Sequence, residues 1–245
     1  MPANQLPPAE AGERLLTLRF LTAEESGWAP AGFEMGWAQV QLDGGRADAR
    51  AAGHDSEHTT WTGDVAVDDE GGLLHPAFAA SPALTLWRAP TDNDRIGGMA
   101  DRWASWGLPE LRRTLVSIER GADAVIVRSI WKTGAGIEVP HVASISSDAR
   151  GRIRVAETVE IPDVLADLPR VGTVLALTPG HEELDWMGRG PHETMPDRKR
   201  GGRVGCWTTT VTDQLVPYVR PQESGGHADV RWLALRREDG PGIRI

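Results

Sequence analysis

Apolar and polar residues alternate along much of the chain, with the period of two that a half-buried β-strand requires. In the segment 152–161 the odd positions are apolar apart from Glu157, and the even positions are polar or small. The same alternation predicts five further strands, at 15–20, 36–42, 124–131, 171–178 and 230–235. Clusters of Gly, Pro and Asp separate them, as turns do. The pattern predicts an all-β protein of mainly antiparallel strands.

One short segment has a helical pattern instead. Asp101 is a suitable N-cap, Trp103 and Trp106 share one face, and Gly107 and Pro109 terminate the pattern. The sequence therefore predicts a short helix that caps a sheet edge.

Glu157 interrupts the apolar face of its predicted strand. Such a residue lies at a frayed end, pairs with a buried arginine, or faces a ligand cavity. The first two explanations are favoured, because an unpaired buried carboxylate is costly.

The segment 43–57 is polar, rich in glycine and alanine, and without periodicity, as is typical of a linker. We therefore place a domain boundary near Gly45, between domains at 1–45 and 46–245. The first part offers two or three strands, too few to close a sandwich, so it is expected to belong to another domain. Because 241–245 ends within a strand-like pattern, the second domain is expected to be truncated at its C-terminus.

Composition and charge narrow the function classes. The 245 residues are 40% hydrophobic, enough for a substantial core, and the formal net charge of −9 argues against binding nucleic acid or an anionic membrane. No signal peptide or membrane-spanning run is visible, so a cytoplasmic location is expected. The single cysteine, Cys206, cannot form an internal disulfide and is expected to be a buried strand residue.

The chain has ten tryptophans but only three phenylalanines and one tyrosine. Tryptophan offers both a flat apolar face, which sugars favour, and an N–H donor. Four of the tryptophans lie in or beside strand-like runs and are expected to be core residues and not a binding platform: Trp131, Trp186, Trp207 and Trp232.

Several kinds of site are not predicted. His54 and His58 are four residues apart, but their segment is too polar and glycine-rich for a dependable helix, so no metal site is expected. The sequence 181–183 lacks the second histidine of a zinc hydrolase helix. A Gly-x-Ser-x-Gly nucleophile turn is missing. No phosphate-binding loop is predicted either, because the pair Gly188 and Gly190 is followed at once by Pro191, which cannot donate an N–H.

Carboxylates and arginines remain, in three polar clusters. In the first, Arg88 precedes Asp92, Asn93 and Asp94, whose short side chains can fix a tight turn after Pro90. Alternatively, the four polar residues form a floor that binds hydroxyl groups or orients a neighbouring domain. The sequence leaves both readings open.

The second cluster is the irregular segment 188–198, which also holds Arg189 and His192. Here Glu193, Asp197 and Arg198 can form an internal network, with Arg198 bidentate to an acid. Two carboxylates could also act as acid and base in glycoside hydrolysis, if their side chains lay about 5 to 10 Å apart.

The third cluster is 218–226. Tyr218 is expected to seal one end of a sandwich, and Glu223 offers a polar edge beside Pro221.

The combination of three stretches resembles a known family: LWRAPTDND at 86–94, WMGRGPHETMPDR at 186–198 and VPYVRPQESGGHADVRWLAL at 216–235. In this order and at these separations they are similar to the C-terminal part of the large β-galactosidases of glycoside hydrolase family two, called domain five or small chain. The segment 16–42 resembles the closing strands of the immunoglobulin-like domain that precedes it.

The resemblance implies a large antiparallel β supersandwich, similar to galactose mutarotases, that packs beside a catalytic barrel or large subunit and helps to shape a galactoside pocket. In that family the catalytic glutamates lie on the upstream barrel, as do Mg and Na. The resemblance therefore implies no catalytic residue, metal or cofactor in this chain, and inactivity in isolation. A tryptophan that stacks on substrate lies beyond the C-terminal end of the match. A homo-oligomer is implied for the full-length enzyme.

The residues expected to bind substrate or form a domain interface are Arg88, Asp92, Asn93, Asp94, Arg189, His192, Glu193, Asp197, Arg198, Tyr218 and Glu223. Two alternatives remain. The chain could be a stand-alone carbohydrate-binding or small-subunit assembly module. It could also be a mutarotase-like isomerase that uses His192 with Glu193 or Glu223 as acid and base.

Overall fold

A computed structural model describes residues 13–43, 66–148, 151–238 and 240–245. The chain divides into two compact units, 1–57 and 58–245. The boundary predicted near Gly45 and the His54–His58 pair lie outside the described residues.

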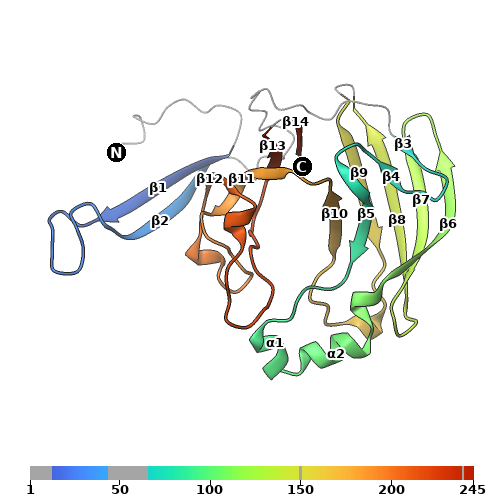
Figure 1. The fold of residues 1–245 in the computed structure, drawn as a ribbon, viewed down its shortest axis with the longest axis horizontal. Coiled ribbons are helices and arrows are strands. Elements are labelled where there is room, and N and C mark those ends of the chain that lie inside the picture. Colours follow the sequence, from blue (N-terminus) through green and yellow to red (C-terminus); the bar gives the residue numbers. More distant parts are fainter. Residues whose placement is uncertain (1–12, 44–65, 149–150, 239) are drawn as a thin grey trace. The chain divides into compact units, whose positions relative to one another are not determined.

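The first unit is an antiparallel hairpin of β1 (Arg14–Leu21) and β2 (Glu34–Asp43), drawn in blue in Figure 1. Leu16 pairs with Val40 and Leu18 with Ala38. Apolar side chains are exposed on both strands and in the turn, where Trp28 is 70% exposed. Two strands alone bury little apolar surface, as expected for part of a larger sandwich.

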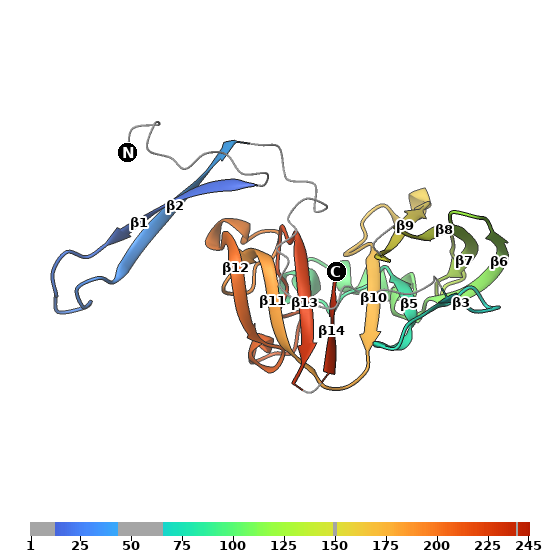
Figure 2. The same cartoon turned by 90° about the horizontal axis from the view of Figure 1, so that it is seen from above.

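The second unit contains two four-stranded antiparallel sheets, which Figure 2 shows side by side in sequence colours. One has the order β6 (Arg112–Arg120), β7 (Val125–Lys132), β8 (Glu138–Ser147), β9 (Ile153–Val159). The other has the order β12 (Arg203–Thr210), β11 (His181–Gly190), β13 (Trp232–Arg237), β14 (Gly240–Arg244). Two short antiparallel pairs complete the strands: β5 (Phe78–Thr85) with β10 (Gly172–Leu177), and β3 (Ala66–Val67) with β4 (Leu73–Leu74). The predicted all-β architecture is confirmed.

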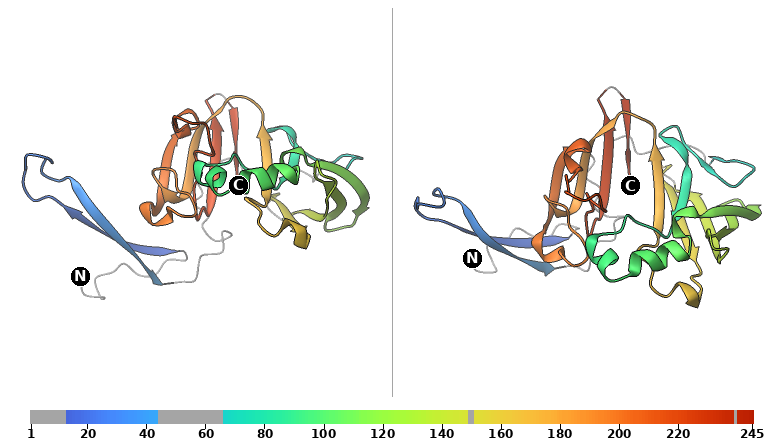
Figure 3. Two further views of the ribbon diagram at one scale, coloured as in Figure 1. Left: turned by 90° about the horizontal axis from the view of Figure 1, so that it is seen from below. Right: turned by 60° about the horizontal axis from the view of Figure 1, so that its bottom comes forward.

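Two short helices, α1 (Asp92–Ile96) and α2 (Met99–Ser105), follow one another along one edge of this unit (Figure 3). Of the two readings left open for 92–94, the structural one is nearer to the structure: these residues form the first turn of α1, which Thr91 and Asp94 cap. The one helix predicted from the sequence corresponds to α2. It begins at Met99, two residues before Asp101, and follows Gly98, whose φ is 71°. It ends before Gly107, whose φ of 66° suits glycine. Short 3₁₀ turns cover Leu108–Glu110, Asp163–Leu165, Lys199–Gly201 and Thr212–Gln214.

The main core of the second unit packs residues of strands and of the connecting turns against α2. Trp103 is 2% exposed, and its indole N–H donates to the Asp167 carbonyl at 2.9 Å. Each such fully buried side chain contributes about 1.5 to 3 kcal/mol. The buried members are Leu84, Leu86, Trp103, Leu108, Trp131, Val139 and Leu165. A second cluster comprises Val67, Leu73, Val127, Ala143 and Ile145.

Trp131 and Trp186 are buried, as predicted, whereas Trp207 and Trp232 are only half-buried. The burial predicted for Cys206 is wrong: its side chain is exposed. Cys206 lies in β12, an edge strand that pairs only with β11, and edge strands are less covered than central ones. Within the described residues, no helix is long and apolar enough to cross a membrane.

Candidate functional site

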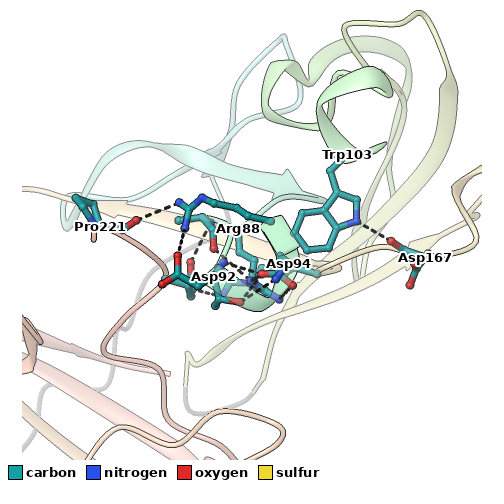
Figure 4. A network of polar contacts seen from close by, with 11 residues as sticks. Arg88, Asp92, Asp94, Trp103, Asp167 and Pro221 are labelled. Carbon is teal, nitrogen blue, oxygen red and sulfur yellow. Dashed lines mark hydrogen bonds and ion pairs between the residues drawn. The ribbon is translucent and has the colours of Figure 1, made fainter. Parts of the chain in front are cut away.

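The first polar cluster caps helix α1, as Figure 4 shows. The Arg88 guanidinium makes two hydrogen bonds to the Asp94 carboxylate, at 2.6 and 3.1 Å. The Thr91 backbone N–H and hydroxyl donate to the same carboxylate, at 2.7 and 2.8 Å. Burial by itself raises the pKa of Asp94, but the hydrogen bonds from Arg88 and Thr91 outweigh it and the net pKa is lowered. Asp94, 3% exposed, is therefore a structural residue.

Asp92 and Asn93 lie on the exposed side of α1. The Asp92 carboxylate pairs with Arg95 at 3.2 Å and with Arg220 of the third cluster at 3.5 Å. The four polar residues of the first cluster therefore do not form one shared floor, since Arg88 and Asp94 bind each other and Asp92 faces outward.

The second and third clusters meet at Glu193. Its Oε1 accepts a hydrogen bond from the Tyr218 hydroxyl, and its Oε2 accepts one from the Gly225 N–H at 2.9 Å. The hydrogen bond to Glu193 raises the pKa of Tyr218. Beside it, the Thr194 N–H donates to the Gly226 carbonyl at 2.7 Å. Both oxygens of Glu193 thus hold two distant loop segments together.

Arg189 forms the centre of a second network in the same region. Its Nε donates to Asp229 at 2.6 Å, and its Nη1 donates to the carbonyls of Lys199 and Gly202, at 3.0 and 2.8 Å. The hydrogen bond from Arg189 lowers the pKa of Asp229. The bidentate ion pair expected for Arg198 is not present among the described residues. Arg189 instead holds this loop, with one ion pair to Asp229 and two hydrogen bonds to carbonyl groups.

Glu223 connects the third cluster to the first. Its Oε1 accepts from Arg170, and its Oε2 accepts from the Ala89 N–H at 3.2 Å. Nearby, Arg95 donates to the Pro221 carbonyl at 3.1 Å. The three sequence clusters are therefore one continuous polar network in space, with the third cluster as the bridge.

The isomerase alternative receives no support from this geometry. His192 is exposed, and the oxygens of Glu193 and Glu223 accept hydrogen bonds from other groups. Asp197 is exposed as well. Among the described residues, no group of three or more His, Cys, Asp or Glu side chains is arranged to hold a metal ion.

Several contributors to the network were not anticipated, among them Thr91, Arg170 and Asp229. Thr91 could have been found, because Thr and Asp three positions apart approximate the capping-box spacing. Arg170 and Asp229 had no such signal, since their side chains pair with partners 30 or more positions away, and Asp229 adopts an uncommon φ of 53°.

Glu157 lies apart from this network, in β9. Its carboxylate accepts from Thr173 and lies 3.1 Å from Nε2 of the buried His141. The hydrogen bond with His141 is the main cause of the lowered pKa of Glu157. Of the three explanations offered for this residue, the two favoured ones are wrong: its partner is a histidine, and the carboxylate lines a cavity.

The fold and the network define an all-β domain in which clustered acids hold loops together by hydrogen bonds. The family described as Beta galactosidase small chain matches residues 59–244, and the family described as Beta-galactosidase, domain 4, matches residues 1–43. The first match covers most of the length of this chain. The chain therefore belongs to the β-galactosidase small chain family.

Individual relatives of this chain are also β-galactosidases by name. The chain is 27% identical to a β-galactosidase from Priestia megaterium, over 96% of this chain and 25% of the relative. It is 30% identical to β-galactosidase BgaC from Bifidobacterium adolescentis, over 89% of this chain and 23% of the relative. A β-galactosidase from Arthrobacter sp. strain B7 is 29% identical, over 97% of this chain and 26% of the relative. The chain thus spans about a quarter of the length of these relatives.

Proposed function

We propose that this chain is the non-catalytic C-terminal portion of a cytoplasmic β-galactosidase that hydrolyses terminal β-D-galactosides such as lactose. The observation that carries the proposal is the family match over 59–244, within relatives named β-galactosidase that are about four times as long. In this arrangement the chain supports a catalytic barrel and helps to form the sugar pocket. Mg and Na, where the enzyme uses them, are held by the barrel.

The hydrogen bonding of the acidic residues supports a non-catalytic role. A retaining glycosidase needs two carboxyl groups about 5 to 5.5 Å apart, both available to the sugar. Glu193, Glu223 and Asp94 instead accept hydrogen bonds from two or more protein donors each. Their geometry stabilises loops, which is the task expected of a supporting domain.

The test is an activity assay on the purified 245-residue chain with a chromogenic β-D-galactoside. We expect no turnover above the buffer rate, because the acid and nucleophile belong to another part of the enzyme. Robust hydrolysis by the pure chain, reproduced after a further purification step, would contradict the proposal.

The family description as a small chain favours a second possibility, a subunit that assembles with a separate large chain. A mixing experiment distinguishes a separable subunit from a covalently continuous domain. This chain is mixed with a β-galactosidase from which the matching C-terminal quarter has been deleted. Co-elution with recovered activity supports a separable subunit. Separate elution supports a covalently continuous domain, and the homo-oligomeric state proposed for the full-length enzyme would then be measured on the continuous polypeptide.

A further inference from the structure

His227 is a half-buried histidine that directly follows the third cluster. Its imidazole ring lies against the indole of Trp186 in β11, with ring centroids 4.1 Å apart and planes inclined by 31°. Trp186 itself is 2% exposed. At the edge of the ring, His227 Nε2 lies 2.5 Å from the side-chain oxygen of Gln214, in the 3₁₀ turn Thr212–Gln214. The ring is therefore held between a strand of the sheet and a turn.

These contacts define a neutral imidazole that carries one hydrogen. The Gln214 amide oxygen can only accept, so the hydrogen lies on His227 Nε2. The other ring nitrogen, Nδ1, then holds a lone pair; it is buried and has no hydrogen-bond partner within the described residues. Protonation would place a second N–H and a positive charge at this buried atom, which is costly.

The charged groups around the ring do not compensate for this cost. Burial lowers the pKa of His227 from its ordinary value of 6.5, and it outweighs the opposing effects of the Arg189 carbonyl and the Glu193 charge. Both oxygens of Glu193 already accept hydrogen bonds, and the Arg189 guanidinium is paired with Asp229. In the adjoining 3₁₀ turn the only charged side chain, Asp213, is exposed.

The segment 225–229 around this histidine joins the loops of the second and third clusters. The Thr194 N–H donates to the Gly226 carbonyl at 2.7 Å, and the Ala228 N–H donates to the Thr194 hydroxyl at 2.7 Å. The Arg189 N–H donates to the Ala228 carbonyl at 3.0 Å. Because the residues on both sides of His227 are bonded in this way, full exposure of its ring to water requires that these hydrogen bonds open.

We propose that His227 is a pH-sensitive latch for the junction between the second and third clusters. The neutral ring packs on Trp186 and keeps the segment 225–229 closed. A protonated ring regains its hydration only when the segment opens, so acid shifts the equilibrium towards the open form. This inference goes beyond the proposed function and does not depend on it.

The direction of the pH dependence follows from the lowered pKa. Above pH 6.5, the ordinary pKa of histidine, the ring is neutral in both forms and the closed junction has its full stability. As the pH falls below 6.5, the ring protonates first in the open form, and the closed form loses stability. The loss is complete below the pKa of the closed form.

The first measurement is an NMR titration of the His227 ring in the 245-residue chain. The ring protons can be identified without a variant, because cross-relaxation with the Trp186 indole follows from the 4.1 Å stacking distance. We expect a midpoint below the ordinary value of 6.5. A midpoint at or above this value would overturn the proposal.

The second measurement is amide hydrogen exchange at about pH 7.5 and about pH 5.0, expressed as protection relative to the intrinsic rate. We expect the protection of the Thr194 and Ala228 amides to fall by about threefold or more at the lower pH. Amides of β7, a central strand of the other sheet, serve as the reference and should change little. Equal losses in β7 would indicate general acid loosening and would overturn the proposal.

Three variants test whether His227 causes the effect. His227→Gln replaces the ring with a neutral amide and should remove the loss of protection at low pH. His192→Gln, which removes an exposed histidine, is the matched control and should keep it. Gln214→Glu places a carboxylate beside Nε2, so it should raise the midpoint of His227 and reduce the loss.

Circular dichroism checks that each variant is folded. If His227→Gln does not fold, Gln214→Glu and the titration of the parent chain decide the question. Unchanged protection in the parent chain at low pH, or the same loss in His227→Gln as in the parent, would show that His227 is not a latch.

Discussion

At the residue scale, the acids of the polar clusters are used as hydrogen-bond acceptors for the backbone and for other side chains. Glu193 accepts a backbone N–H from Gly225, Glu223 one from Ala89, and Asp94 one from Thr91. A charged acceptor makes a stronger hydrogen bond than a neutral one, which suits loops without regular ladders. Substitutions at these positions should therefore affect stability first.

Tyr218 is the only tyrosine in the chain, so its titration can be followed by tyrosinate absorbance without assignment. The hydrogen bond to Glu193 raises its pKa above the ordinary value of 10.0, and Glu193→Gln should move the titration back towards that value. Because the folded pKa is the higher one, the interaction stabilises the fold below pH 10 and this stability is lost as the pH rises towards the folded pKa. Titration of the parent chain at or below pH 10, with the fold intact by circular dichroism, would contradict the assignment.

Asp94→Asn should be strongly destabilising, by about 3 kcal/mol, because it leaves the Arg88 guanidinium without its buried acceptor. The exposed Asp92→Asn is the matched control and should cost less than about 1 kcal/mol. Urea denaturation of both variants measures the difference. Since the folded pKa of Asp94 is lowered from 3.8, its contribution is present above that pH and is lost as the pH falls through the folded pKa. Equal effects of the two substitutions would show that Asp94 is not the structural acid.

At the element scale, six predicted strands are present to within about two residues, because a period of two directly reflects a half-buried strand. The strand expected at 230–235 begins instead at Trp232, since Asp229 adopts a φ of 53° and Arg231 N–H bonds the Met187 carbonyl. Strands such as β6, β8, β11 and β12 were not predicted. In β11 the alternation is obscured by charged residues and by Gly188 and Gly190.

Glu223 and Pro221 of the third cluster bond to Ala89 and Arg95, and this bridge can be tested by hydrogen exchange. Glu223→Gln should increase the hydrogen-exchange rate of the Ala89 amide by about tenfold, because a neutral acceptor binds Ala89 and Arg170 less strongly. The Gly225 amide, which is bound by Glu193, is an internal reference and should change little. Equal acceleration of both amides would indicate general loosening of the loop, not loss of this bridge.

At the scale of the whole molecule, both units carry family matches, and together they correspond to about a quarter of each relative. The exposed apolar residues of β1 and β2 fit this relation, since a two-stranded hairpin is marginal by itself. Under the proposed function, a chain of this kind contributes packing and loop geometry to a larger enzyme, and for that reason we expect no activity in isolation.

The sequence by itself determined the strand-rich architecture and the family, because alternation and motif order are local properties that survive without coordinates. It also located the three polar clusters, for which the family resemblance implied no catalytic role. Only the tertiary structure decided that Asp94 serves a helix cap, that Arg189 and not Arg198 forms the loop network, and that Cys206 is exposed. The Arg189 network depends on a partner 40 positions away, and the exposure of Cys206 depends on the edge position of β12. The partners of Asp94 are near in sequence, but only the folded helix turn brings them to its carboxylate. Charge and spacing along a chain do not specify which donors will approach a carboxylate once the strands are paired.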